Sequence, residues 1–104
     1  METVCVRVRL EPGSLTRVRE WAAELNARRD EVLATLTDEG VRVESVFLDG
    51  ETLVYYMKAE SLDRAREVYA RSQHAIDAYH QRFKDETFAE QTQLELLVDF
   101  ENVD

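Results

Sequence analysis

The chain has 104 residues, of which 44% are hydrophobic, and this is the size and composition of one domain, residues 1–104, with one core. Its 22 acidic and 13 basic side chains give a net charge of −9, which argues against nucleic acid as a partner, because binding to phosphates needs clustered Lys and Arg. The longest apolar run, residues 53–57, is far too short to span a bilayer. No pattern typical of a secretion or transit leader opens the chain. The single cysteine, Cys5, cannot form an internal disulfide, which fits a reducing compartment. We therefore expect a cytoplasmic protein without a membrane segment.

The first elements are a strand and a long helix. Residues 4–10 alternate with a period of two, which is typical of a strand with one apolar face. Pro12 and Gly13 interrupt this pattern, and Ser14 is suited to cap a helix. Apolar residues then recur every three or four positions until Gly40, a residue typical of helix ends. We predict one helix over residues 15–39, with Trp21 packed against the sheet or a partner.

A hairpin follows the long helix. Residues 41–48 and 51–59 flank Asp49-Gly50, a dipeptide that favours a two-residue type I′ turn. With this turn, Phe47 would lie opposite Thr52, and Val46 opposite Leu53. The second strand is apolar or aromatic on both faces over residues 53–57, and such a strand is normally covered on both sides.

The remaining pattern predicts two helices and a last strand. Ser61 is placed to cap a helix that carries Leu62, Ala65, Val68 and Tyr69, and the polar residues 72–74 interrupt it. A second helical pattern contains Ile76, Tyr79 and Phe83. Residues 85–93 are ambiguous, whereas residues 94–100 alternate again and predict the final strand.

The order β-α-β-β-α-β is that of a ferredoxin-like α+β fold, an antiparallel sheet with helices on one face. The other face would then be open and would carry Cys5, Arg7 and Arg9 opposite Glu95, Leu97 and Asp99. It would also carry large apolar side chains of the strand at residues 53–57. Depending on which way this strand faces, these are Val54 and Tyr56 or Tyr55 and Met57. An exposed aromatic sheet marks an interaction surface, and a second copy related by a two-fold axis is its simplest cover. We predict a homodimer through the open face.

Several stretches carry a resemblance to the dimeric α+β barrel superfamily: the long helix that ends at Gly40, residues 46–49 and the strand at residues 54–57. The arrangement is similar to L-rhamnose mutarotases and antibiotic-biosynthesis-type monooxygenases. Residues 43–49, 55–60 and 74–80 more narrowly resemble a family of small uncharacterised prokaryotic proteins. The resemblance implies a fold and a dimer, but no known activity. The histidine that mutarotases use on their first long helix has no counterpart before His74.

His74, Asp77 and His80 form the series H-x-x-D-x-x-H. Asp77 and His80 could reach one ion from a helix, but His74 would lie about 120° from His80 unless the helix begins near His74. We therefore predict no metal site, and take His74 and Asp77 as ligand-binding candidates. His80 is the candidate general acid or base, since imidazole titrates near neutral pH. The alternative is structural: His74 near a helix cap, Asp77 at the helix dipole and His80 half-buried.

Other candidate residues lie in the predicted sheet. Tyr55 and Tyr56 point to opposite faces, and Tyr56 is the candidate proton donor; core packing is the alternative for either. Arg7 and Arg9 could clamp an anionic ligand, or pair with Glu95 and Asp99.

No phosphate loop, dinucleotide fingerprint or nucleophile motif occurs, so no cofactor is predicted. The sequence favours a homodimeric α+β barrel that binds a small organic molecule and performs cofactor-independent acid–base chemistry of isomerase or monooxygenase type. The alternative is a non-catalytic dimer that senses a ligand or serves as an assembly module.

Overall fold

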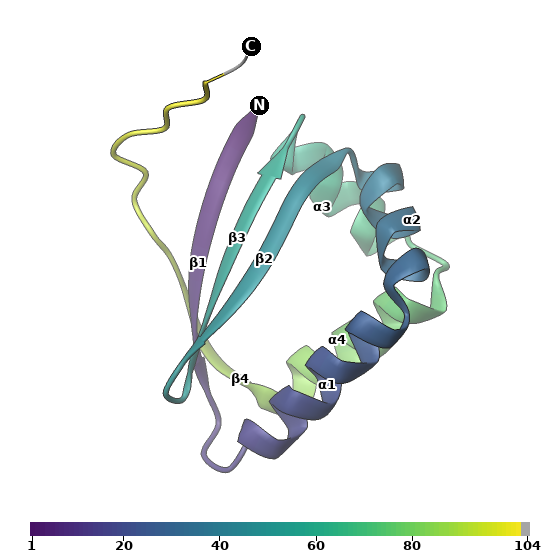
Figure 1. Ribbon diagram of the computed structural model, residues 1–104, viewed down its shortest axis with the longest axis vertical. Coiled ribbons are helices and arrows are strands. Elements are labelled where there is room, and N and C mark those ends of the chain that lie inside the picture. Colours follow the sequence, from purple (N-terminus) through teal and green to yellow (C-terminus); the bar gives the residue numbers. More distant parts are fainter. Residues whose placement is uncertain (103–104) are drawn as a thin grey trace.

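Residues 1–102 are described by a computed structural model, and they form four strands and four helices. The strands are β1 (Glu2–Leu10), β2 (Val41–Asp49), β3 (Thr52–Ala59) and β4 (Phe88–Gln93). The helices are α1 (Leu15–Ala27), α2 (Arg29–Glu39), α3 (Leu62–Ala70) and α4 (Ala75–Thr87). All neighbouring strands are antiparallel in the order β2-β3-β1-β4, and the helices cover one face of the sheet (Figure 1). The predicted ferredoxin-like α+β fold is confirmed.

The face of the sheet toward the helices is the one that the alternation of β1 predicted. Val8 and Leu10 are buried there together with Leu53 of β3, Val18 and Trp21 of α1 and Phe83 of α4. A smaller apolar cluster, Val41, Ala59 and Ala65, closes the other end of the sheet near α3. The core thus consists of two clusters, one at each end of the sheet.

The long helix predicted over residues 15–39 is wrong as a single element. The chain leaves helical geometry at Arg28 (φ −108°, ψ 38°) and continues as α2 in a new direction (Figure 1). Arg28 forms ion pairs with Glu24 and Glu31 on either side of the break, and the acidic residues Asp30 and Glu31 suit the positive end of the new helix dipole. The end of α2 is as predicted, because Gly40 adopts φ 72°.

Predictions for the two helix caps had opposite outcomes. The Ser61 hydroxyl accepts a hydrogen bond from the Arg64 backbone N–H at 3.2 Å, so Ser61 caps α3 as predicted. The Ser14 side chain makes no such bond at the start of α1, and only its carbonyl accepts from Val18.

The hairpin register differs from the prediction by two residues. Phe47 lies opposite Val54 and Val46 opposite Tyr55, so the turn residues are Gly50 and Glu51. Gly50 adopts φ 60°, and no other residue type in the described chain has positive φ, which excludes a type I′ turn. Because a shift of two residues preserves the side-chain alternation, residues 43–49 and 52–58 stay on their predicted faces. Val54 and Tyr56 therefore lie on the open face, and Tyr55 and Met57 face the helices. A bulge between Val41 and Val43 breaks the alternation, and Val41 packs with Ala59 and Ala65 on the helix side.

The last strand is the clearest error of the sequence prediction. Residues 88–93 pair with β1, whereas residues 94–100, predicted as the strand, belong to no helix or strand. Phe88 explains the choice, because it lies opposite Leu10 and packs edge-on against Tyr55 and Phe83 in the core. Arg9 accordingly pairs with Glu90 at 3.4 Å rather than with the segment beyond β4, and Arg7 lies opposite Thr92.

Residues 94–100 pass along the open side of β1 (Figure 1). Asp99 accepts hydrogen bonds there from the Thr3 hydroxyl at 2.8 Å and from the Lys58 ammonium of β3 at 3.0 Å. The apolar side chains of this segment are exposed: 37% of Leu94, 56% of Leu96, 67% of Val98 and 89% of Phe100. We call residues 94–100 the apolar tail.

Candidate functional site

A cavity of about 280 Å³ lies between the sheet and the helices. Val4, Val6 and Val8 of β1 and Met57 of β3 line it from the sheet, and Leu25, Leu36 and Ile76 line it from the helices. Its walls are mainly apolar, but ionisable residues also contribute to them: Glu39 of α2, Glu44 of β2, Tyr55 of β3, Arg66 and Tyr69 of α3, and Asp77, His80 and Lys84 of α4. Thr35, Gln91 and Gln93 add polar, uncharged side chains.

The Tyr55 hydroxyl has no hydrogen-bond partner among the residues that the structure describes, although the oxygen is fully buried. Burial raises the pKa of this phenol, and the nearby Glu44 carboxylate raises it further, so Tyr55 keeps its proton. A buried hydroxyl without a partner costs free energy and is uncommon in folded proteins. Since Tyr55 lines the cavity, a ligand oxygen there could accept its hydrogen bond.

His80 is half-buried in the same cavity and does not carry charge. Its Nδ1 accepts a hydrogen bond from the Trp21 indole N–H at 3.0 Å, which places the imidazole proton on Nε2. Burial lowers the pKa of His80 to about 3, and the Lys84 ammonium contributes in the same direction. His80 is therefore a neutral donor through Nε2–H, and it is not a base that titrates near neutral pH.

Three carboxyl groups, of Glu39, Glu44 and Asp77, and two cations, Arg66 and Lys84, line the cavity. Burial raises the pKa of Glu39 to about 7, and the negative charges of Asp77, Glu44 and Asp38 contribute. Glu44 keeps contact with solvent, but the surrounding protein also raises its pKa. Lys84 is half-buried, which lowers its pKa, and its ammonium lies 4.7 Å from the centre of the Tyr69 ring.

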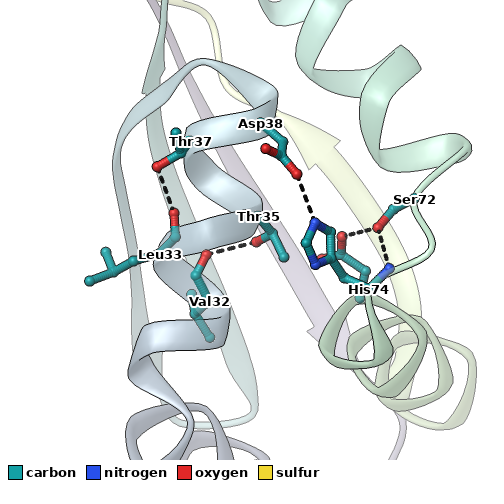
Figure 2. Close-up of polar contacts among 8 residues, drawn as sticks. Val32, Leu33, Thr35, Thr37, Asp38, Ser72 and His74 are labelled. Carbon is teal, nitrogen blue, oxygen red and sulfur yellow. Dashed lines mark hydrogen bonds and ion pairs between the residues drawn. The ribbon is translucent and has the colours of Figure 1, made fainter.

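His74 lies outside this cavity and reaches toward α2. Its Nε2 is 2.7 Å from the Asp38 carboxylate, and this hydrogen bond raises the pKa of His74 (Figure 2). The His74 backbone N–H donates to the Ser72 hydroxyl, which donates to Asp77. An open surface depression at this contact shares Thr35, Glu39 and Asp77 with the cavity.

The structure brings some of the predicted site residues together and separates others. Asp77 and His80 line the cavity, but His74 turns away from them, and residues 1–102 contain no cluster of three potential metal ligands. Arg7, Arg9 and Tyr56 alternate onto the open face, opposite the cavity. Tyr56 was the predicted proton donor, but Tyr55 is the tyrosine of β3 that lines the cavity.

Besides Tyr55, five ionisable residues of the cavity lining were not predicted as site residues: Glu39, Glu44, Arg66, Tyr69 and Lys84. Two of them had a weak signal in the sequence. Glu39 lies on the apolar stripe of its helix, immediately before the terminating glycine, and Glu44 lies on the same strand face as Val46. An acidic residue on an apolar face is uncommon, but one sequence gives no indication of whether it has a partner.

Comparison with known proteins agrees with this fold. A model of the "Family of unknown function (DUF6176)" matches residues 1–104, and none of the curated proteins matches the sequence. An L-rhamnose mutarotase from Formosa agariphila is a structural neighbour, with 19% identity and a TM-score of 0.66 over 97% of this chain and 100% of that one. An antibiotic biosynthesis monooxygenase shares 13% identity, with a TM-score of 0.57 over 94% of this chain and 100% of its own.

A third neighbour is described as a dimeric protein of unknown function with a ferredoxin-like fold, from Bacteroides fragilis. It shares 20% identity, with a TM-score of 0.54 over 88% of this chain and 90% of its own. At such identities the likeness demonstrates the fold alone. The expected resemblance to a family of uncharacterised proteins is confirmed by the family model, and the structural neighbours confirm the ferredoxin-like fold. No helix within residues 1–102 has the length and apolar character needed to cross a membrane.

Proposed function

This chain belongs to the Family of unknown function (DUF6176), and we propose that it forms a homodimer in which each protomer binds a small organic molecule between its sheet and its helices. The observation that carries the proposal is the cavity of about 280 Å³ between the sheet and the helices. Tyr55 lines this cavity, and its buried hydroxyl has no hydrogen-bond partner among the described residues. Small-molecule sites are concave and mostly apolar, with a few placed polar groups, and this cavity has that character.

The polar groups of the cavity support acid–base chemistry without a cofactor. Tyr55 and His80 are uncharged donors, and Glu39 is a carboxyl whose pKa of about 7 allows it to gain and lose a proton near neutral pH. His80 serves in this proposal as a donor, and Asp77 contributes through its charge. The three carboxyl groups of the lining outnumber its two cations, Arg66 and Lys84, which favours an uncharged ligand over an anionic one.

Dimerisation is supported by the uncovered face of the sheet. Phe47 is 61% exposed and Val43 is 40% exposed there, beside Val54 and Tyr56. The apolar tail adds further exposed apolar side chains along the same side of β1. Exposed apolar patches of this kind usually mark an interface, and one neighbour of this fold is described as dimeric. The single Cys5 keeps the cytoplasm as the proposed compartment.

The second candidate function, a non-catalytic assembly module, is favoured by the same exposed tail. The two candidates differ in what the cavity does: an assembly module needs the open face and the tail, but it does not need a ligand between sheet and helices.

A native mass spectrum of the protein purified from cells tests both parts of the proposal. We expect twice the chain mass and a discrete small-molecule adduct. Val6→Phe, which fills the floor of the cavity, should remove the adduct and retain the dimer. Phe47→Ser, on the opposite face, should weaken the dimer and retain the adduct. A wild-type dimer without any adduct would favour the assembly module, and a monomer would refute the interface.

A further inference from the structure

Glu39 is a largely buried residue whose carboxyl group has no hydrogen-bond partner among residues 1–102. It is the last residue of α2, only 9% of it is exposed, and it lines the cavity. No hydrogen bond or ion pair within residues 1–102 involves its side chain, and its carboxyl oxygens keep some accessible surface although the residue as a whole is largely buried. Carboxylates in such surroundings are normally paired or hydrogen-bonded. A group held in so unfavourable a position is a candidate for a functional role.

The charges around Glu39 oppose its ionisation. Glu44 faces it from β2, Asp77 from α4 and Asp38 from its own helix, and Lys84 of α4 only partly offsets them. His74 lies on the far side of Asp38 and interacts with it directly. Glu39 also stands at the negative end of the α2 dipole, which disfavours a carboxylate. A proton on Glu39 is therefore exchanged near neutral pH, the range in which a general base is most effective.

Two uncharged donors line the same cavity. Tyr55 has a hydroxyl without a partner among residues 1–102, and His80 carries its proton on Nε2 because Trp21 occupies its Nδ1. The centres of the Tyr55 and His80 rings are 6.3 Å apart, so the two rings are neighbours in the cavity wall. Neutral donors fixed in an apolar site stabilise an oxygen that gains negative charge during a reaction. The ligand that complements this cavity has an acceptor oxygen for the donors and an acidic proton for the carboxylate.

We propose that Glu39 transfers a proton to and from the carbon next to the carbonyl group of a small uncharged ketone or aldehyde, while Tyr55 and His80 donate hydrogen bonds to the carbonyl oxygen. The inference rests on the proposed function, since it needs a ligand in the cavity. The proton moves from carbon to the Glu39 carboxylate, the C–H electron pair forms a carbon–carbon double bond, and the carbonyl π pair moves to oxygen. Glu39 then returns the proton to the same carbon or to a conjugated one, so no oxidant or cofactor is consumed.

The position of Glu39 also provides a route for the proton to solvent. Glu39 lines both the cavity and the surface depression at the contact between Asp38 and His74. Its carboxyl can therefore exchange its proton with water on one side and with a ligand on the other. This predicts that hydrogen at the reacting carbon is replaced by solvent deuterium during turnover.

The experiment uses 2-indanone, a small flat ketone with acidic C–H groups, as the probe. Its exchange in D₂O is followed by the loss of the proton NMR signal at the carbon next to the carbonyl. We expect the wild-type protein to exchange these protons at least about tenfold faster than Glu39→Gln, a loss of about 1.4 kcal/mol of transition-state stabilisation. The wild-type rate should rise with the loss of one proton near pH 7. Glu67→Gln, the same change at an exposed site on α3, should match the wild type.

Binding is measured separately, from the shifts of the Val6 and Val8 methyl signals in the cavity. If 2-indanone shifts these signals but wild type and Glu39→Gln exchange at equal rates, the role of Glu39 is refuted and the proposed function stands. If the methyl signals do not move, the carbonyl class of ligand is refuted, and the native mass spectrum decides the proposed function independently. A direct ¹³C titration of the Glu39 carboxyl with a midpoint near 4.5, its ordinary value, would also refute the inference.

Discussion

Replacing Glu39 by glutamine should stabilise the protein, and by an amount that depends on pH. Glutamine has nearly the same size and shape as glutamate, but it places no charge beside Asp38, Glu44 and Asp77. The pKa of Glu39 is raised in the folded state by burial and by these neighbours. Charging this residue therefore weakens the folded state relative to the unfolded chain, where the carboxyl is solvated.

The magnitude follows from the pKa of the two states. A carboxyl with a pKa of 4.5 in the unfolded chain and about 7 in the folded protein binds its proton more tightly when folded. The stability that this proton provides is complete below pH 4.5 and is lost as the pH rises toward 7. The total loss is at most between about 3 and 4 kcal/mol, at about 1.4 kcal/mol for each tenfold change in proton affinity. Glu39→Gln should thus match the wild type near pH 4 and exceed its stability near pH 8.

Urea denaturation of both proteins at fixed protein concentration measures this difference across the pH range. The other titrating groups contribute to both proteins, so the difference between the two curves isolates Glu39. Glu67→Gln is the matched control, because its exposed carboxyl should give no pH-dependent difference. A constant difference between wild type and Glu39→Gln from pH 4 to pH 8 would refute the reasoning about the charges of the cavity.

Three further predictions concern the same cavity and the open face. Tyr55→Phe removes a buried hydroxyl without a partner, so it should leave stability in urea unchanged or raise it by up to about 1 kcal/mol, while ligand affinity falls; a clear loss of stability would contradict this. In imidazole NMR, His80 should stay neutral down to about pH 4.5, whereas His74 should titrate above the usual value of 6.5 because of Asp38; equal midpoints would contradict the assigned environments. A chain that ends at Gln93 lacks the apolar tail and should sediment as a monomer at micromolar concentration; an unchanged dimer would exclude the tail from the interface.

The face alternation of the strands could be predicted from local pattern, and so could the ends of several elements. Val8 and Leu53 are buried as their period of two requires, and Gly40 ends a helix because its φ of 72° suits a residue without a Cβ. The error of two residues in the hairpin register did not change which face most side chains point to, because side chains alternate between faces with a period of two. Strand alternation and helix ends depend on residues that are close in the chain, so they can be predicted from a single sequence.

The break at Arg28 and the position of β4 depended on contacts between distant segments. Residues 94–100 alternate as well as a strand does, but alternation alone does not select a partner. Residues 88–93 pair with β1 because Phe88 fills the space between Leu10, Tyr55 and Phe83. The alternating apolar side chains of residues 94–100 form no strand and remain exposed beside the open face.

The sequence by itself determined the ferredoxin-like order of elements, the two faces of the sheet and the expectation of an uncovered aromatic face. Only the tertiary structure decided which ionisable groups share the cavity: Tyr55 rather than Tyr56, Glu39 in addition to Asp77, and a neutral His80 held by Trp21. The physical reason is that proton affinity and hydrogen-bond partners depend on burial and on charges a few ångströms away. The groups that supply them come from α1, α2, β2, β3 and α4, which lie far apart in the chain and adjacent only in the fold.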